Sequence, residues 1–245
     1  MGVAHNGQGS ASVPPCGLTR VPEPATVCLT IVRLENEPGE ERGLPRMVEV
    51  SRRRAIEDVA SELFRAHGYS ATSVRDIARA LDIQGPSLYA HVTSKEDVLW
   101  AIIDRTAGRF EAATEAALAG AGSAGHGQGP AEALAILVRT HVRVITDDVG
   151  AAAVFVSEWR ALGDARRAAV LARRDAYERR FRNLIEGGIA TGDFAIVDPA
   201  VASIAILSAL NGIPAWYDGS GRLTPDRIAD HFVDLVLRML QGADR

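Results

Sequence analysis

Two short helical segments separated by a tight turn constrain the fold more than any other feature of this sequence. Ser73, with Asp76 three positions later, forms the pattern of a capping box at a helix start. The apolar residues that follow share one helical face, namely Val74, Ile77, Ala78 and Leu81. Asp82 tolerates the left-handed conformation of a tight turn, and Pro86 suits a first helical turn because its missing N–H has no partner there. The sequence therefore predicts a short helix, a turn and a second short helix that begins near Gly85.

Longer helices are predicted on both sides of this pair. Before it, an apolar stripe with helical spacing runs from Ser51 to Gly68, and its members are Ile56, Val59, Ala60, Leu63 and Phe64. After it, Ser94 with Asp97 three positions later marks a further helix start, with acidic residues where the helix dipole favours them. Together these segments predict a helix-turn-helix, whose second short helix can enter the major groove of DNA.

The second short helix and the residues beside it carry the side chains that we expect to contact DNA. The N-terminal end of this helix is polar and small, and it consists of Gln84, Gly85, Pro86 and Ser87. Tyr89 and His91 are expected to reach phosphate oxygens, and Lys95, the only lysine of the chain, adds a point charge. Three successive arginines end in Arg54, and they are either a solvated helix start or an arm that follows the phosphates.

The stretch "ATSVRDIARALDIQGPSLYAHVTSKEDVL" carries a recognisable pattern. Its residues in register are Thr72, Ile77, Ala78, Leu88, Tyr89, His91 and Lys95. Over residues 51–98 the chain resembles the TetR family of one-component transcriptional regulators, and we count Thr72 and Ser73 with the expected DNA contacts. Three residues depart from the usual pattern: Asp82 replaces a frequent glycine, Gln84 a frequent serine and Val92 a frequent phenylalanine. The first two affect the turn and bear on operator choice, whereas Val92 is expected to be a smaller core residue.

Composition limits the kinds of partner. The chain has 245 residues, of which 47% are hydrophobic and only 5% aromatic, and this favours an all-helical fold. Its net charge of −4 gives no global attraction to nucleic acid or membrane. Residues 47–109 hold nine basic and nine acidic side chains, so charges that bind DNA must gather on one face. The two cysteines, Cys16 and Cys28, leave no disulfide or zinc framework for the folded part, which fits a reducing cytoplasm.

We predict three parts and about nine helices in an all-α chain. Residues 1–46 lack sustained periodicity and are expected to be a disordered tail, although residues 24–32 could form a strand and natural translation could start near Met47. Residues 47–96 form the helix-turn-helix domain, and residues 97–245 form a ligand-binding and dimerisation domain. The run Gly120–Gly125 has a dinucleotide-binding spacing, but it follows a helical segment rather than a strand, so we interpret it as a linker.

No catalytic motif and no metal-ligand spacing is visible in the sequence. We therefore expect no cofactor, no metal and no enzymatic activity. The alternative is a helical enzyme that uses a cavity of the larger domain.

The larger domain is predicted to be built from amphipathic helices. Residues 164–192 have an apolar inner stripe of Val170, Tyr177, Phe181, Leu184 and Ile185. The arginines of the same segment are expected to point mostly to solvent, and they are Arg166, Arg173, Arg174 and Arg180. Gly187, Gly188 and Gly192 are expected to loosen the end of this helix.

The last two helices are expected to form a subunit interface. Residues 201–210 are about half as long as a membrane span requires, so we predict a buried helix there. That helix and the one that opens with Thr224 and Pro225 carry more apolar residues than one face can bury. We therefore predict a homodimer. Twofold symmetry would place two recognition helices about 34–36 Å apart on a palindromic operator.

The family resemblance also implies a ligand cavity inside the larger domain. Helices that begin near Pro130, Gly150 and Asp164 should line it, and the helix after Pro199 should close it. The expected apolar lining is Leu137, Phe155, Leu184 and Leu207. The expected polar or aromatic lining is His141, Trp159, Arg160, Asn211, Trp216 and Tyr217.

Residues 209–240 resemble the C-terminal part of TetR-family repressors that respond to acyl-CoA esters. Asn211, Trp216, Tyr217 and Gly221 fit that pattern approximately, whereas Asp218 stands in place of an arginine and Gly219 in place of a proline. Phosphate-pairing charge would then come from other arginines, such as Arg160, Arg173 or Arg180. The resemblance thus implies a cytoplasmic repressor released from its operator by an acyl-CoA thioester, with a free apolar small molecule as the alternative effector.

Overall fold

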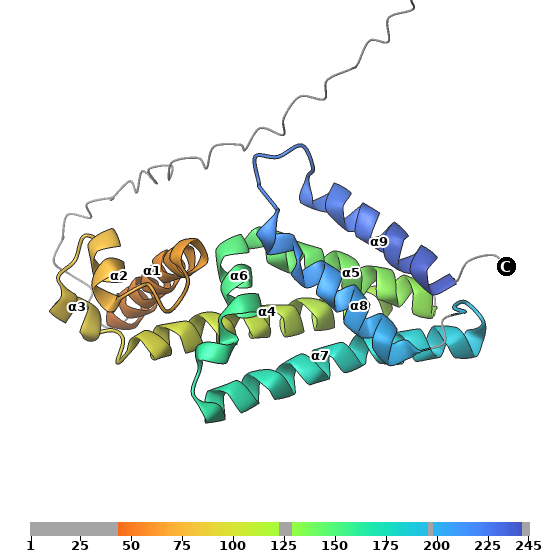
Figure 1. Ribbon diagram of the computed structural model, residues 1–245, viewed down its shortest axis with the longest axis horizontal. Coiled ribbons are helices and arrows are strands. Elements are labelled where there is room, and N and C mark those ends of the chain that lie inside the picture. The colour runs from red at the N-terminus through yellow and green to blue at the C-terminus, as the bar shows by residue number, and fades with distance from the viewer. Residues whose placement is uncertain (1–43, 123–128, 196–197, 242–245) are drawn as a thin grey trace, which may run out of the picture. The chain divides into compact units, whose positions relative to one another are not determined.

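The structure is a computed structural model, and it describes residues 44–122, 129–195 and 198–241. Within these ranges every regular element is helical, which confirms the all-α prediction. The α-helices of Figure 1 are α1 (Leu44–His67), α2 (Val74–Ala80), α3 (Gly85–Tyr89), α4 (Lys95–Gly122), α5 (Pro130–Asp147), α6 (Val149–Ser157), α7 (Asp164–Thr191), α8 (Pro199–Asn211) and α9 (Pro225–Gln241). Two 3-10 helices are η1 (Trp159–Ala161) and η2 (Ile213–Ala215). Residues 1–43, with the suggested strand and the two cysteines, and residues 123–125 of the predicted linker lie outside the described residues. Residues 120–122 of that linker belong instead to the end of α4, because the alanine-rich helix continues through Gly120.

The first helix begins and ends for local reasons. α1 starts at Leu44, before the expected start at Ser51, and ends at His67. The next residue, Gly68, has a positive φ of 81°, a conformation that costs glycine little because it has no Cβ. Its N–H donates to the carbonyl of Phe64 at 2.8 Å, which satisfies one of the last carbonyls of the helix.

The predicted helix-turn-helix is present in α2 and α3. At the start of α2 the N–H of Asp76 donates to the Ser73 hydroxyl at 3.2 Å, and the N–H of Ser73 donates to the Asp76 carboxylate at 2.9 Å. This reciprocal pair is the capping box that the sequence predicts. Asp82 makes the turn with a φ of 53°, and α3 begins at Gly85 with Pro86 in its first turn. The two short helices pack on each other, and Ile77 of α2 and Leu88 of α3 are both fully buried.

Helix α4 belongs to both predicted domains. It packs on α1 at the helix-turn-helix end and on α5, α6 and α7 along the larger domain (Figure 1). Its first turn is capped as predicted, because the N–H of Asp97 donates to the Ser94 hydroxyl at 3.0 Å. The proposed boundary between residues 96 and 97 falls within this first turn. Helix α4 is therefore shared by the helix-turn-helix and the larger domain.

Three arginines of α7 face α4 instead of solvent, so their predicted orientation is wrong. The pairs are Arg166 with Glu96 and Asp97, Arg173 with Asp104 and Glu111, and Arg180 with Glu115. Seven residues make close to two helical turns, so residues 166, 173 and 180 form one stripe along α7. Arg173 is bidentate on Glu111, at 2.7 and 2.8 Å. Each partly exposed pair contributes at most about 1 kcal/mol, but the row fixes which face of α7 meets α4.

The glycines near the end of α7 do not loosen the helix. α7 continues through Gly187 and Gly188 to Thr191, and Gly192 caps it with a φ of 84°. The ring of Phe194 folds back onto Gly188, where a Cβ would lie only 2.1 Å from the ring. Gly188 therefore provides space for Phe194, which is 4% exposed.

In the single chain, helix α8 is buried on one face and exposed on the other. Ala202, Ile206 and Leu210 are buried, whereas Val201 and Ile204 are more than half exposed. On α9, Leu235 and Met239 are exposed as well, and α8 contacts α9. Among the described residues, no helix combines the length and the apolar character that crossing a bilayer requires.

Candidate DNA-binding face and ligand cavity

The N-terminal end of α3 presents the polar surface that the sequence predicts. The side chains of Gln84, Pro86 and Ser87 are exposed, while Leu88 points inward and is fully buried. Tyr89, at the C-terminal end of α3, is 57% exposed, so its ring lies outside the hydrophobic core. Apart from its own chain neighbours and helix backbone, no atom of the described residues lies within 4 Å of the place where a Cβ of Gly85 would lie. His91 follows α3 and is half-buried.

Thr72 and Ser73 have structural contacts at the start of α2. Thr72 is 3% exposed, and its hydroxyl donates to the carbonyl of Gly68 at 2.9 Å. The hydroxyl of Ser73 takes part in the capping box with Asp76. Both hydroxyls therefore shape the turn before α2. A role for Thr72 in binding DNA would have to come from its backbone or through the turn that it holds.

Lys95 ties α4 to the same turn. Its ammonium group donates to the carbonyl of Tyr69 at 2.8 Å and to the carbonyl of Thr72 at 2.9 Å, and it lies 4.1 Å from the centroid of the Tyr69 ring. An ammonium group has three N–H donors, so these two contacts leave one for a phosphate. Sequence reasoning found this residue but missed its contacts with the turn.

Arg54 lies at the junction of α1 with the larger domain. Its guanidinium pairs with Asp58 at 3.1 Å and reaches Asp148, the N-cap of α6, at 4.0 Å. These carboxylates, and not α3, are its neighbours, so the structure favours an internal pairing over the proposed phosphate-tracking arm. Two arginines that the sequence analysis did not single out lie nearer α3. Arg75 and Arg79 of α2 line a hollow together with Gln84 and Gly85.

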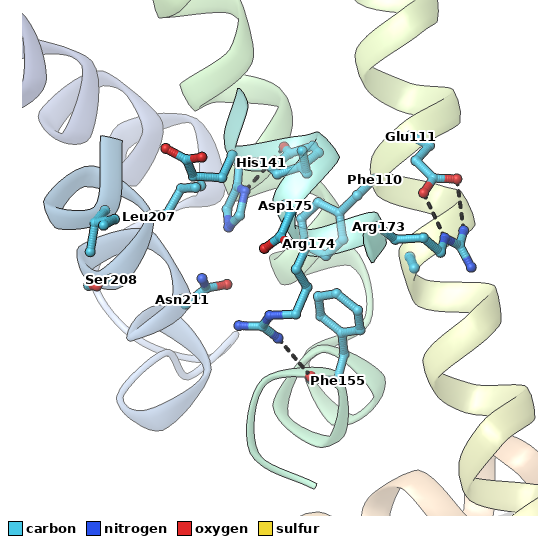
Figure 2. A pocket seen from close by; sticks show the side chains of 14 residues that line it. Phe110, Glu111, His141, Phe155, Arg173, Arg174, Asp175, Leu207, Ser208 and Asn211 are labelled. Carbon is cyan, nitrogen blue, oxygen red and sulfur yellow. Dashed lines mark hydrogen bonds and ion pairs between the residues drawn. The ribbon is translucent and has the colours of Figure 1, made fainter. Parts of the chain in front are cut away.

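A cavity of about 220 Å³ lies in the larger domain (Figure 2). Residues from α4, α5, α6, α7 and α8 line it, as the family resemblance implies for the last four. The lining residues are Ala107, Phe110, Glu111, His141, Phe155, Arg173, Arg174, Asp175, Tyr177, Glu178, Ile204, Leu207, Ser208 and Asn211. The contribution of α8 comes from residues three or four apart, which lie on one face of the helix.

An aromatic cluster forms one wall of this cavity. The ring of Phe110 on α4 stands at its centre, 4.7 Å from the His141 ring and 5.6 Å from the rings of both Phe155 and Tyr177. The Tyr177 hydroxyl lies 3.2 Å from Nδ1 of His141. Burial raises the pKa of Tyr177 to about 12, so its hydroxyl stays protonated. Phe110 thus places the connecting helix α4 in direct contact with the interior of the cavity.

His141 is buried and uncharged. Burial, with the positive charge of Arg174 as a smaller cause, lowers the pKa of His141 from 6.5 to about 3. Its Nε2 is buried and has no hydrogen-bond partner among the described residues. A buried polar atom without a partner costs free energy, and such atoms are commonly satisfied by water or by a ligand. The neutral ring is therefore a candidate hydrogen-bonding group for a molecule in the cavity.

The predicted ligand residues divide into two groups. His141, Phe155, Leu207 and Asn211 line the cavity. The others do not line it, namely Leu137, Trp159, Arg160, Leu184, Trp216 and Tyr217. Leu137 is fully buried in the core, and Trp216 and Tyr217 follow the break at η2, beyond the part of α8 that reaches the cavity.

Sequence reasoning missed several lining residues that come from α4 and α7. Phe110 is the clearest, and its helical spacing from Ile103 and Ala107 was the available signal. Arg174 was expected to point to solvent. It is half-buried instead, and it donates to the carbonyl of Phe155 at 3.4 Å (Figure 2).

Comparisons with known proteins agree on one family. Residues 56–102 match the family profile described as "Bacterial regulatory proteins, tetR family", and residues 127–240 match the profile "Tetracyclin repressor-like, C-terminal domain". A solved TetR-family regulator, PfmR from Thermus thermophilus, is 32% identical and superposes with a TM-score of 0.66, over 78% of this chain and 99% of that chain.

Two further relatives also extend over most of the chain. AibR, solved in complex with isovaleryl coenzyme A and operator DNA, is 28% identical over 75% of this chain and 97% of that chain, with a TM-score of 0.64. The transcriptional repressor KstR2 of Rhodococcus jostii is 27% identical over 192 residues, which are 76% of this chain and 89% of that protein. With its helix-turn-helix and its helical ligand-binding domain both matched, the chain belongs to the TetR family of transcriptional regulators.

Proposed function

We propose that this protein is a repressor that leaves its operator when an acyl-CoA thioester, or a similar small apolar effector, occupies the cavity of the larger domain. The observation that carries the proposal is the position of α4. Phe110 of this helix forms the cavity wall, and Lys95 at its first turn holds the turn before α2. The cavity and the turn before α2 therefore both contact the same helix, α4.

DNA reading is assigned to the exposed end of α3. Gln84 and Ser87 are small enough and polar enough to contact base edges, and their substitution should change which sequence is preferred. Tyr89 is placed to contact the phosphate backbone, and Arg75 and Arg79 are close to the same end of α3. These contacts are local, which suits a chain whose overall charge is negative.

Effector binding is assigned to the cavity because aromatic and aliphatic side chains supply apolar wall and polar groups converge on it from several helices. Such a composition is typical of small-molecule sites in proteins. The lone Nε2 of His141 and the amide of Asn211 supply hydrogen bonds, and Phe110 and Leu207 supply apolar contact. AibR, a relative over most of the chain, was solved with isovaleryl coenzyme A, and this supports a thioester as the effector here.

A homodimer through α8 and α9 completes the proposal. Leu235 of α9 and Val201 of α8 are each 62% exposed, although neighbouring positions on both helices are buried. Exposed apolar residues on two adjacent helices favour contact with a second copy. Leu235→Glu should convert the dimer to a monomer in size-exclusion chromatography with light scattering, whereas Arg227→Glu on the same helix should not. A wild-type protein that is monomeric at micromolar concentration would contradict this part.

The function is tested by gel-shift experiments with the DNA upstream of the protein's own gene. We expect specific retardation by the wild type, loss of retardation in Tyr89→Ala, and release of the DNA by an acyl-CoA thioester. Leu207→Trp fills the cavity and should still bind DNA but no longer respond to the thioester. If the wild type gives no specific retardation, or if Tyr89→Ala retards the DNA as the wild type does, α3 is not the recognition helix. A catalysed turnover of the thioester would favour the alternative of a helical enzyme.

A further inference from the structure

Arg174 of α7 and Arg160 of η1, which both stack on Trp159, differ from the arginines of α7 that face α4. Arg166, Arg173 and Arg180 each pair with carboxylates of α4. Arg174 and Arg160, in contrast, lie within ion-pair distance of no carboxylate among the described residues. Arg160 is exposed, but Arg174 is half-buried, and a half-buried guanidinium group without a counter-ion requires an explanation.

Both of these guanidinium groups are held by one aromatic residue. The guanidinium carbon of Arg160 lies 4.5 Å from the centroid of the Trp159 ring, and that of Arg174 lies 5.5 Å from it. Arg174 also lies 5.3 Å from the ring of Phe155. Stacking on aromatic rings fixes a guanidinium plane while leaving most of its N–H donors available. Only one of the five donors of Arg174 is used in the described structure, in the bond to the Phe155 carbonyl.

The two positive charges disfavour each other. Burial lowers the pKa of Arg174, and the charge of Arg160 lowers it further. Placing two unpaired cations on the same indole is unfavourable in the free protein, and an anion that contacts both of them would remove this repulsion. An anion with two negative charges matches the pair better than a single carboxylate does.

The size of the cavity indicates where the anion belongs in the ligand. A volume of about 220 Å³ is less than the roughly 300–1,000 Å³ of most small-molecule sites, so it holds only a small apolar group. Arg174 lines the cavity, whereas Arg160 and Trp159 do not line it. A ligand whose apolar end fills the cavity can contact Arg174 there, and a charged group that extends out of the cavity along Trp159 would reach Arg160. Figure 2 shows Arg173 turned onto Glu111, while Arg174 extends between Phe155 and Asn211.

We propose that Arg160 and Arg174, stacked on Trp159, form a subsite for a phosphate or pyrophosphate group of the effector. The inference rests on the proposed function, since it names the group that recognises the charged end of the same ligand. The sequence suggested Arg160, Arg173 and Arg180 for this role. Arg173 and Arg180 are already neutralised by Glu111 and Glu115, so the subsite consists of Arg160 and Arg174 instead.

The test compares two thioesters that differ in their phosphates. Isothermal titration calorimetry measures binding of isovaleryl coenzyme A and of isovaleryl pantetheine, which keeps the thioester but has no phosphate. Arg160→Met and Arg174→Met retain apolar stems and remove the charges, and Arg167→Met is the matched control because Arg167 pairs with Asp164 away from the cavity. Thermal unfolding of each variant, with and without inorganic pyrophosphate, gives an independent readout of the anion alone.

We expect each of the two variants to weaken binding of the coenzyme A ester by about 10- to 100-fold, the effect of losing hydrogen bonds to a charged group. Binding of the pantetheine ester should stay unchanged in both variants, and Arg167→Met should bind both esters as the wild type does. In thermal unfolding, pyrophosphate should raise the melting temperature of the wild type and of Arg167→Met, but not of Arg160→Met or Arg174→Met. Equal loss of both esters, or no loss of either, would overturn the subsite and leave the effector proposal intact.

Two other results separate the subsite from the proposed function. Failure of the wild type to bind either ester, with pyrophosphate stabilisation that depends on Arg160 and Arg174, would retain the subsite and overturn the thioester as effector. Binding of free isovalerate more tightly than either ester would overturn the assignment to phosphate.

Discussion

Acid should destabilise this protein partly through one buried side chain, His141. Its pKa lies at about 3 in the folded protein and near 6.5 in an unfolded chain. Between these values the unfolded state binds one proton more than the folded state, so stability falls as the pH is lowered. At about 1.4 kcal/mol per pH unit, the loss between pH 7.5 and pH 5 is roughly 2 kcal/mol.

The measurement is the free energy of unfolding in urea at several pH values for the wild type and for His141→Leu. Other titrating groups act equally in both proteins, so the difference between the two pH profiles isolates His141. Between pH 7.5 and pH 5, the free energy of unfolding of His141→Leu should fall by roughly 2 kcal/mol less than that of the wild type. Parallel profiles for the two proteins would mean that His141 is hydrated or paired in the folded state, and would remove it as a neutral ligand-binding group.

Three further outcomes follow from local geometry. Lys95→Ala should weaken binding to all DNA sequences alike, and the dependence of DNA affinity on salt should fall by the contribution of about one phosphate contact. A changed operator preference with the same salt dependence would contradict this role. Gly188→Ala should lower the free energy of unfolding in urea by about 1–3 kcal/mol because the new Cβ collides with Phe194. Gly187→Ala is the control: its Cβ meets only an ordinary contact at 3.5 Å, so the free energy of unfolding should not fall. Deleting residues 1–41 should leave the melting temperature and dimerisation unchanged, since that segment lacks a periodic apolar stripe; a large fall in melting temperature would show that it docks on the folded part.

Most of the site at the DNA-binding face could be predicted from sequence because its determinants are close together in the chain. The capping box of Ser73 and Asp76, the left-handed Asp82 and the position of Pro86 act within one or two turns. Such local preferences do not depend on distant partners. What the sequence could not supply was the contact of Lys95 with carbonyls more than twenty residues earlier, because a flexible lysine has many possible acceptors.

The cavity was predictable only in its outline. The helices that surround it follow from periodicity and family resemblance, and His141, Phe155, Leu207 and Asn211 were correctly placed in its lining. Leu137 and Tyr217 were not, because helical spacing shows that a face is apolar but not whether another side chain fills the space beside it. A cavity is the volume that packing leaves empty, and this depends on all neighbouring helices together.

The sequence by itself determined the helical fold, the helix-turn-helix and the family, because these depend on local caps, turns and repeating apolar positions. The tertiary structure decided which charges are neutralised. The arginines of α7 look alike in sequence, yet Arg173 meets Glu111, whereas the neighbours of Arg174 in the described part of the chain are aromatic rings and a carbonyl. Adjacent residues on a helix point about 100° apart, so a difference of one position selects between a carboxylate partner on α4 and the edge of the cavity. The packing of helices that are distant in sequence sets that choice.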